Sequence, residues 1–201
     1  KKNEMYKHQV KRETNKKGFT DIEDYLASLE LKISIFENDE SIIPRMSQMS
    51  QKTNQFNLTT KRHTKRHTES DIQNFIDNKN TDVYAFSVSD KFGDSGVTGL
   101  SIVSSNSDIA EIDTLLMSCR IIGRNIEYSF MNYIVKKIDD KKIKYINAKY
   151  ISSPKNVQVD EFYEKCSFSL NKSTDSGKNY TLEINNYMPK QINYIEVVNG
   201  K

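Results

Sequence analysis

Residues 110–138 read AEIDTLLMSCRIIGRNIEYSFMNYIVKKI, and this stretch contains a strand, a loop and a helix in immediate succession. Its first part is apolar on both faces near its end, which is typical of a central strand. Its last part places Ile126, Phe130 and Ile134 on one face of a helix. Because parallel strands need a crossover between them, this helix predicts a parallel neighbour for the strand. The chain is therefore expected to form a mixed α/β sheet.

The loop between this strand and this helix is RIIGRN, residues 120–125. The unpaired N–H groups in the first turn of a helix point outward with the helix dipole behind them, so such a loop can bind an anion. Arg120 and Arg124 favour phosphate, since a guanidinium group pairs with two phosphate oxygens at once. The alternative is a plain turn from strand to helix, with Gly123 at its bend.

Periodicity elsewhere in the chain supplies the remaining elements of the sheet. VYAFSVSD (83–90) and VTGLSIVSS (97–105) alternate with a period of two around the glycine-containing KFGDSG, which predicts a β-hairpin. With the strand that follows, the hairpin gives three neighbouring strands. The other expected elements are a helix at 21–29, a strand at 31–36, a helix around 42–49, a helix with a capping box at 68–71, a strand at 142–151, a helix at 156–168, short strands near 167–171 and 179–185, and at most an edge strand at 195–198.

The composition is that of an ordinary globular protein. Of the 201 residues, 36% are hydrophobic and 28% are charged, which fits one domain with a substantial core. No run of about 18 apolar residues exists, so no membrane-spanning helix is expected. Cys119 and Cys166 have no CxxC spacing and no histidine close in sequence, so we expect neither zinc nor a disulfide framework, and a reducing, cytoplasmic location.

The net charge of +3 is unevenly distributed. Residues 1–19 hold seven Lys/Arg and two Glu, so the remainder carries −2, which argues against a nucleic-acid-binding domain. The chain starts with KKNEMYKHQVKRE, and we expect a fragment in which residues 1–19 form a basic linker or a frayed helix after a preceding domain. Residues 20–186 are then the folded domain, and residues 187–201 are a loosely held polar tail.

Two of these motifs resemble signatures of the GNAT superfamily of N-acetyltransferases. One superfamily signature is Gln/Arg-x-x-Gly-x-Gly/Ala, like RIIGRN, and the other is Asn…Phe-Tyr-Glu-Lys-x-Gly-Phe, like NVQVDEFYEKCSF at 156–168. Asn125 and Ser167 stand where the superfamily has small residues. The resemblance implies an α/β acetyltransferase fold, with a mixed sheet of about six to seven strands flanked by helices. It also implies a cofactor, either CoA or phosphopantetheine, bound by Arg120, Gly123, Arg124, Asn125 and Asn156.

A narrower resemblance covers nearly the whole chain. QKTNQFNLTTKR (51–62), SDKFGDSGVTGL (89–100) and IDTLLMSCRIIGRNIE (112–127) resemble the C-terminal domain of FkbH-like proteins, where a phosphatase-type domain of the haloacid dehalogenase superfamily precedes an acetyltransferase-like one. This resemblance implies transfer of a glyceryl unit from 1,3-bisphosphoglycerate, with loss of phosphate, to the phosphopantetheine thiol of an acyl carrier protein, as in polyketide extender unit biosynthesis. The implied partners are that carrier protein and the phosphatase-like domain of the same chain.

Three residues are candidates for chemistry. Tyr163 matches the tyrosine with which the superfamily can protonate a departing thiolate; alternatively it is a core or rim tyrosine. Cys119, expected at the end of the central strand beside a helix N-terminus and two arginines, is either an acyl-accepting nucleophile or a buried structural thiol. Asp113 has the same strand parity as Cys119, and it is either a base in the cleft or a paired structural carboxylate.

Amides and hydroxyls are concentrated in QKTNQFNLTT, residues 51–60. We expect this segment to line the acceptor side of the cleft, in a pocket for a polyhydroxy acyl group or a pantetheine arm. The alternative is that its side chains hydrogen-bond the polypeptide itself. The repeat KRHTKRHT (61–68) is a solvated turn, a docking surface for an acidic carrier protein or a weak metal site. The expected substrate-binding residues are Asn54, Gln55, Asn57, Thr59, Thr60 and Arg62.

The sequence leaves three functions open. The first is an acyltransferase-like domain that assists glyceryl transfer to the carrier protein. The second is a non-catalytic module that docks the carrier protein, and the third is a CoA-dependent N-acetyltransferase. None of them calls for a metal ion in this domain.

Overall fold

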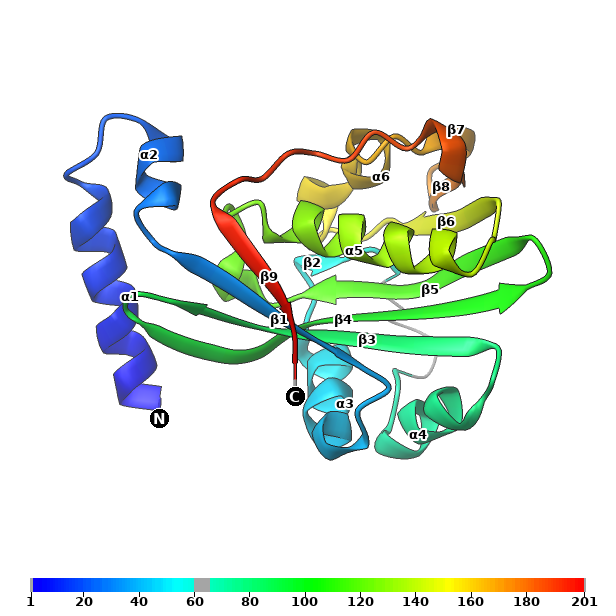
Figure 1. Ribbon diagram of the computed structural model, residues 1–201, viewed down its shortest axis with the longest axis horizontal. Coiled ribbons are helices and arrows are strands. Elements are labelled where there is room, and N and C mark those ends of the chain that lie inside the picture. Colours follow the sequence, from blue (N-terminus) through cyan, green and yellow to red (C-terminus); the bar gives the residue numbers. More distant parts are fainter. Residues whose placement is uncertain (1, 60–65, 201) are drawn as a thin grey trace.

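The computed structural model describes residues 2–59 and 66–200, and these fold around one mixed β-sheet (Figure 1). The strands are β1 (Leu31–Glu37), β2 (Phe56–Asn57), β3 (Thr81–Asp90), β4 (Gly93–Asn106), β5 (Ile109–Met117), β6 (Tyr145–Ile151), β7 (Ser169–Thr174), β8 (Gly177–Glu183) and β9 (Ile195–Asn199). Across the sheet they lie in the order β7-β8-β6-β5-β4-β3-β1-β9, with β2 paired to β5. The pairs β5–β6 and β1–β9 are parallel, and the others are antiparallel.

Helices cover both faces of this sheet. They are α1 (Lys2–Lys16), α2 (Ile22–Ala27), α3 (Ile43–Lys52), α4 (Glu69–Asp77), α5 (Ile126–Asp140) and α6 (Phe162–Lys165), with 3-10 turns η1 (Glu40–Ile42), η2 (Cys119–Ile121), η3 (Val157–Val159) and η4 (Ile184–Asn186). In Figure 1, α5 and α6 lie on one face, α3 and α4 on the other, and α1 and α2 at one end. No helix in the described part of the chain is long and apolar enough to span a membrane. The predicted α/β fold is confirmed, and β2 adds a strand beyond those expected.

The helices follow the spacing and end signals of the sequence. On α5, Ile126, Phe130 and Ile134 are buried, as their helical spacing predicted. At the start of α4, the hydroxyl of Thr68 accepts from the backbone N–H of Asp71 at 3.2 Å, and the N–H of Thr68 donates to the Asp71 carboxylate at 2.8 Å. This is the predicted capping box, which satisfies two backbone donors at the helix end.

β5 and β6 pair over only part of their length. Their register joins residues 109–112 to residues 145–148, and beyond it the two strands separate. β2 pairs antiparallel with the end of β5, and Thr59 forms a parallel bridge with Ile151 of β6. Between these contacts, the N–H of Leu58 donates to a carbonyl of β5 at 3.0 Å, and its own carbonyl accepts from Ile151 at 2.8 Å. The chain itself therefore fills the gap in the sheet.

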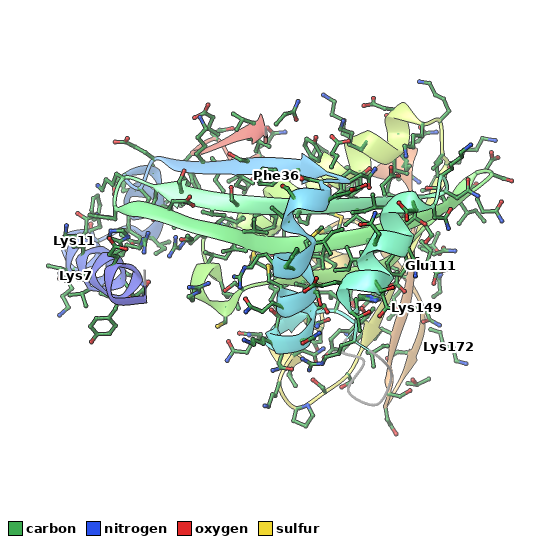
Figure 2. The ribbon with its side chains drawn as sticks, turned by 90° about the horizontal axis from the view of Figure 1, so that it is seen from below. Lys7, Lys11, Phe36, Glu111, Lys149 and Lys172 are labelled. Carbon is green, nitrogen blue, oxygen red and sulfur yellow. The ribbon has the colours of Figure 1, made fainter. Side chains whose placement is uncertain are left out.

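The first segment of the chain is a helix and not a solvated linker. Lys7 and Lys11 project from α1 away from the sheet (Figure 2). Arg12 follows them on the same helix. Its side chain is buried and forms an ion pair with Asp90 of β3 at 2.6 Å. A buried ion pair fixes α1 to the sheet because both charges are shielded from water. That a phosphatase-like domain precedes residue 1 stays a prediction.

The C-terminal segment is also part of the sheet. The tail expected at 187–201 returns along α5, where Asn132 donates its amide to the carbonyl of Lys190 at 2.9 Å. It then forms β9, which pairs in parallel with β1. The edge strand predicted as an alternative at 195–198 is therefore confirmed, and the loosely held tail is corrected.

Two predicted boundaries are also corrected. Cys119 was expected on the same strand face as Asp113. β5 ends at Met117 and Cys119 begins η2, so the two residues are not on one strand and that expectation is wrong. The helix expected at 156–168 is divided into η3 and α6. At the break, the carbonyl of Asp160 accepts from the side chains of Lys178 and Tyr180 on β8, each at 3.1 Å, and these contacts lie outside the helical hydrogen-bond pattern.

Candidate functional site

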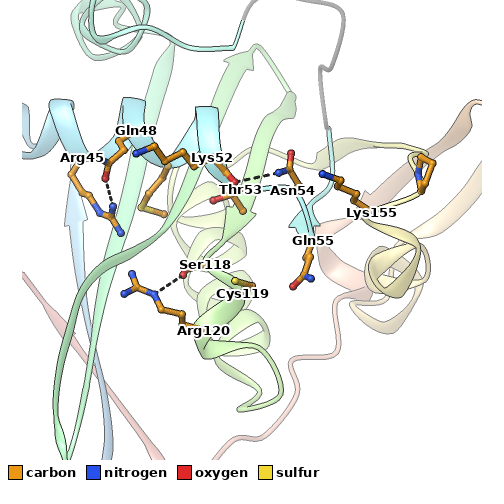
Figure 3. A pocket seen from close by; sticks show the side chains of 12 residues that line it. Arg45, Gln48, Lys52, Thr53, Asn54, Gln55, Ser118, Cys119, Arg120 and Lys155 are labelled. Carbon is orange, nitrogen blue, oxygen red and sulfur yellow. Dashed lines mark hydrogen bonds between the residues drawn. The ribbon is translucent and has the colours of Figure 1, made fainter. Parts of the chain in front are cut away.

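A cavity of about 680 Å³ opens where β5 ends (Figure 3). It is lined by one face of α3, by the segment Thr53–Gln55, by Ser118–Arg120 and by Pro154–Lys155. On α3 the lining positions are 45, 48, 49 and 52, a spacing that places all four side chains on one face of a helix. Cavities of roughly 300–1,000 Å³ are typical of sites for small molecules and cofactors. We call this space the basic cavity.

Four cationic side chains line the basic cavity, and no carboxylate of the described chain does; the cations are Arg45, Lys52, Arg120 and Lys155. The side-chain contacts of Arg45 are neutral, since its Nε donates to the Val97 carbonyl at 3.0 Å and its Nη1 donates to the amide oxygen of Gln48. Burial lowers the pKa of Arg45, and the nearby charge of Arg120 lowers it further. The cavity therefore favours an anionic ligand.

The thiol of Cys119 is exposed and lines the basic cavity. A second cavity of about 730 Å³ lies on the other side of η2, against α1, and Cys119 and Arg120 line it as well. The prediction that Cys119 is a buried structural thiol is wrong. Cys166, by contrast, is buried in the core, and this burial raises the pKa of its thiol. Of the two cysteines, only Cys119 is accessible to a ligand.

The two arginines of the RIIGRN loop have different environments. Arg124 is buried, with Nη1 at 3.3 Å from Asp90 Oδ2 and Nη2 donating to the carbonyl of Arg120 at 3.2 Å. Arg12 binds the same carboxylate through Nε at 2.6 Å and Nη2 at 2.9 Å. The predicted phosphate-binding role of Arg124 is therefore corrected, because its charge is paired with Asp90 and it anchors the loop to β3. Arg120 remains exposed at the basic cavity.

Gly123 and Asn125 shape the end of this loop. Both adopt left-handed backbone conformations, with φ of 82° and 61°. A Cβ on Gly123 would meet no atom within 4 Å, so glycine is favoured there by its φ and not by lack of space. The amide of Asn125 donates to the hydroxyl of Tyr194 at 2.6 Å. This hydrogen bond connects the start of α5 to the C-terminal segment. The Asn125 amide, which the sequence predicted to bind a cofactor, therefore binds Tyr194 of the protein.

Asn156 is fully buried, and its amide binds the polypeptide. Nδ2 donates to the carbonyls of Asn57 at 2.8 Å and Ile151 at 3.0 Å. Oδ1 accepts from the N–H of Ser153 at 2.8 Å and from the hydroxyl of Tyr150 at 3.1 Å. The predicted cofactor-binding role of Asn156 is therefore corrected: this side chain joins the β2 segment to the end of β6.

Asn54 and Gln55 line the basic cavity, where the sequence predicted a substrate-side wall (Figure 3). The carbonyl oxygen of the Asn54 side chain accepts from Arg66 Nη2 at 2.7 Å, which holds this amide in place. Such amides offer both donors and acceptors to a polar ligand. The predicted Thr60 and Arg62, and most of the KRHTKRHT repeat, lie outside the described residues.

Asn57 and Thr59 hydrogen-bond the polypeptide itself, as the alternative prediction for this segment stated. Both are buried. Asn57 Nδ2 donates to the carbonyl of Thr53 at 3.1 Å, and Thr59 Oγ1 donates to the carbonyl of Asp113 at 2.9 Å. Their substrate-binding role is therefore corrected, because their side chains hold the β2 segment in the gap between β5 and β6.

Asp113 belongs to a polar cluster that the sequence did not reveal. His67 Nε2 lies 3.2 Å from Asp113 Oδ2 and 2.9 Å from Thr114 Oγ1, and Thr114 donates to the same carboxylate at 2.7 Å. Asp113 does not line the basic cavity, so the paired-carboxylate alternative holds. The histidine was visible only as part of a repeat, and its partner is far away in the sequence. Within the described residues, no group of three or more His, Cys, Asp or Glu could hold a metal ion.

Tyr163 lies in an aromatic cluster of the core. Its ring centroid is 5.7 Å from that of Phe162, 5.1 Å from Phe168 and 5.3 Å from Tyr180. It is 0% exposed, and burial raises the pKa of its hydroxyl. Tyr163 lines neither cavity beside η2, so the predicted thiolate-protonating role is corrected in favour of the core alternative.

Similarity to known proteins is confined to the fold. No protein-family model matches the chain, and no curated protein matches it. The PaiA N-acetyltransferase of Thermoplasma acidophilum, solved with coenzyme A, is similar with a TM-score of 0.61 and 14% identity over 75% of this chain and 98% of that one. A GNAT-family acetyltransferase from Staphylococcus aureus gives a TM-score of 0.59 and 11% identity over 76% and 99% of the two chains.

The ribosomal-protein-S18-alanine N-acetyltransferase of Escherichia coli is a third example, with a TM-score of 0.56 and 10% identity over 76% of this chain and 94% of that one. The domain therefore has the GNAT fold, as the RIIGRN and NVQVDEFYEKCSF motifs indicated. At these identities the likeness defines the arrangement of helices and strands, and the chemistry must be argued from the cavity.

The different roles of Arg120 and Arg124 can be tested by matched substitutions. Arg124→Gln is expected to lower the free energy of unfolding by about 2 kcal/mol, because the buried Asp90 loses one of its two cationic partners. Arg120→Gln is expected to change it by less than about 0.5 kcal/mol, because its side chain is exposed. Urea unfolding followed by circular dichroism measures both, and equal losses would contradict this division.

The filled gap between β5 and β6 can be tested at Asn156. Asn156→Ala is expected to lower the free energy of unfolding by about 3 kcal/mol, because it leaves several buried backbone groups without a partner. Asn171→Ala, at an exposed side chain on β7, is the control and should cost less than about 0.5 kcal/mol. If the two variants unfold at the same urea concentration, Asn156 does not hold the β2 segment in place.

Proposed function

We propose that this domain assists transfer of an acyl group to the phosphopantetheine thiol of an acyl carrier protein, specifically the glyceryl transfer implied by the resemblance to FkbH-like proteins. The observation that carries the proposal is the basic cavity, where the exposed thiol of Cys119 shares one space with four cations. The GNAT fold is compatible with it, because a similar structure contains coenzyme A, whose thiol-bearing arm is also phosphopantetheine.

The lining of the basic cavity suits the chemistry of such an arm. Phosphopantetheine has a phosphate at one end, two amides along its length and a thiol at the other end. Arg45 and Arg120 can pair with the phosphate, and the amides of Asn54 and Gln55 can hydrogen-bond the amides of the arm. The exposed sulfur of Cys119 can meet the thiol or the acyl group bound to it.

Cys119 is the proposed acyl carrier within the domain. Its thiolate attacks the carbonyl carbon of the acyl phosphate in 1,3-bisphosphoglycerate, the C–O bond to phosphate breaks, and phosphate leaves. The pantetheine thiolate then attacks the resulting thioester and releases the Cys119 thiolate, so the acyl group ends on the carrier protein. Neither step needs a metal ion or an oxidant.

The carrier protein is the proposed partner, together with the expected phosphatase-like domain. Lys52 and Lys155 are exposed in the lining of the basic cavity and would attract an acidic carrier surface. We propose the cytoplasm as the compartment, because both cysteines are free and a reducing environment keeps them so.

A CoA-dependent N-acetyltransferase is the second candidate. Two observations weigh against it. In the RIIGRN loop, Arg124 is paired with Asp90 and Asn125 is bonded to Tyr194, so neither is available to a pyrophosphate. Where β5 and β6 separate, their free edges would be able to pair with an extended ligand. The β2 segment of the chain covers these edges instead.

Calorimetric titration distinguishes these functions. We expect the domain to bind the holo carrier protein, and to bind neither the apo carrier, which lacks the arm, nor acetyl-CoA with comparable affinity. Tight binding of acetyl-CoA without binding of the holo carrier would instead establish a CoA-dependent enzyme. Equal binding of holo and apo carrier would mean that the domain docks the carrier without engaging its arm.

Mass spectrometry of the intact protein tests the role of Cys119. After incubation with holo carrier protein loaded with a glyceryl thioester, we expect the domain to gain one glyceryl group. Cys119→Ser should lose at least about nine-tenths of this labelling, whereas Cys166→Ala should retain it because Cys166 is buried. Unchanged labelling of Cys119→Ser would leave only the docking role.

A further inference from the structure

We infer that the second cavity beside η2 holds the acyl group while it is bound to the sulfur of Cys119. This cavity measures about 730 Å³, and its lining comes from α1, from the start of β4 and from the segment that contains η2. We call it the acyl pocket. The inference rests on the proposed function for the identity of the acyl group, and it adds where that group lies and which side chains recognise it.

Cys119 is the residue at which a ligand in one cavity can reach a ligand in the other. Its exposed thiol lines the basic cavity (Figure 3) and also the acyl pocket. A thioester on this sulfur has to accommodate its own acyl chain and must also be open to attack by a second thiolate. Two cavities that share the sulfur allow the acyl chain and the pantetheine arm to approach it without occupying the same volume.

The wall that α1 contributes to the acyl pocket is held in place by the hairpin between β3 and β4. Arg12 of α1 donates to the carboxylate of Asp90 at 2.6 Å and 2.9 Å, and the same carboxylate accepts from the backbone N–H groups of Phe92 and Gly93 at 3.0 Å and 3.2 Å. At Gly93, φ is 149° and a Cβ would lie 2.3 Å from Cε1 of His8, so only glycine permits this approach of the helix. The pocket is therefore preformed, which lowers the entropic cost of binding.

The acyl pocket differs from the basic cavity in the sign of the charges that line it. Two of its arginines, Arg12 and Arg124, pair with Asp90, and its lining also includes the carboxylate of Asp94. Four cationic residues line the basic cavity, and no Asp or Glu of the described chain does so. A glyceryl group is uncharged, whereas the pantetheine arm carries a phosphate. The acyl pocket therefore suits the first of these groups, and the basic cavity suits the second.

The polar side chains of the acyl pocket suit a short acyl chain that carries hydroxyl groups. A glyceryl group has a hydroxyl on each of the two carbons beyond its carbonyl, and the lining offers the amide of Gln9, the carboxylate of Asp94 and the hydroxyl of Ser95. Asp94 Oδ1 accepts from the N–H of Gly96 at 2.7 Å, and Gln9 Nε2 donates to Glu13 Oε1 at 3.1 Å, so both groups are oriented. Hydroxyls can donate to the carboxylate and can both donate to and accept from the amide.

Disulfide exchange at Cys119 measures this recognition without any acyl transfer. The protein is equilibrated with the disulfides of two thiols: thioglycerol, which has two hydroxyls on a three-carbon chain, and propanethiol, which has the same chain without them. The Cys119 thiolate attacks the S–S bond, one probe thiol becomes attached and the other leaves as a thiolate. Intact-protein mass spectrometry gives the ratio of the two adducts, which is divided by the ratio for glutathione in the same mixture.

Thioglycerol is expected to be preferred at Cys119 by at least about five-fold over its preference at glutathione, which is about the contribution of one net hydrogen bond. Cys166 is buried and should form no adduct with either probe. The absence of any preference at Cys119 would overturn the inference. It would also be overturned if neither probe forms an adduct there.

Substitutions then locate the hydroxyl groups. The double variant Gln9→Ala, Asp94→Ala should reduce the preference to less than about two-fold, and it is expected to fold because both side chains are exposed. Asp175→Ala removes an exposed carboxylate between β7 and β8 and should leave the preference unchanged. If the preference is lost in Asn54→Ala or Gln55→Ala and kept in the double variant, the acyl group lies in the basic cavity and the inference is overturned.

The result is separable from the proposed function. If thioglycerol is preferred through Gln9 and Asp94 but the holo carrier does not bind, the acyl pocket stands and the carrier-protein function falls. If the holo carrier binds and loads a glyceryl group onto Cys119 while thioglycerol is not preferred, the function stands and the acyl pocket is overturned.

Discussion

Beyond Ile112 and Ala148 the two central parallel strands, β5 and β6, no longer pair, and their backbone groups need other partners. The segment with β2 supplies them, and the buried amide of Asn156 secures it from the side of β6. This segment follows α3 directly, so filling the gap also fixes where α3 ends and brings Thr53–Gln55 to the wall of the basic cavity. The position of the candidate site therefore depends on which segment fills the gap between β5 and β6.

The side chains on the two sides of η2 differ in how their charges are paired. On the side of α1, Asp90 lies between Arg12 and Arg124, so three ionic groups are buried together and hold the helix, the hairpin and the loop. On the side of α3, the cations have no carboxylate beside them within the described lining. A buried, paired arginine supports the fold, whereas an exposed one that lines a cavity can meet a ligand. One six-residue loop thus contributes an arginine of each kind.

The GNAT fold is common to proteins that act on different substrates, so the fold alone does not assign a function. Two features of this domain bear on its function. The gap between β5 and β6 is filled by the protein, and the basic cavity beside it combines an exposed thiol with four cationic side chains. The basic cavity is the observation on which the proposed transfer to a phosphopantetheine arm rests.

The sequence by itself determined the elements whose signals are local: the helix from Ile126, the hairpin on either side of KFGDSG, and the cap at Thr68, each set by side chains within one or two turns. The wall of the cavity was also predicted in part, at Asn54 and Gln55. Tertiary structure alone decided that Arg124 pairs with Asp90, that Asn57 and Asn156 bind the chain, and that Cys119 is exposed. The reason is physical: periodicity reports which face of an element is apolar, whereas the partner of a polar group depends on which distant segment lies within about 3 Å of it.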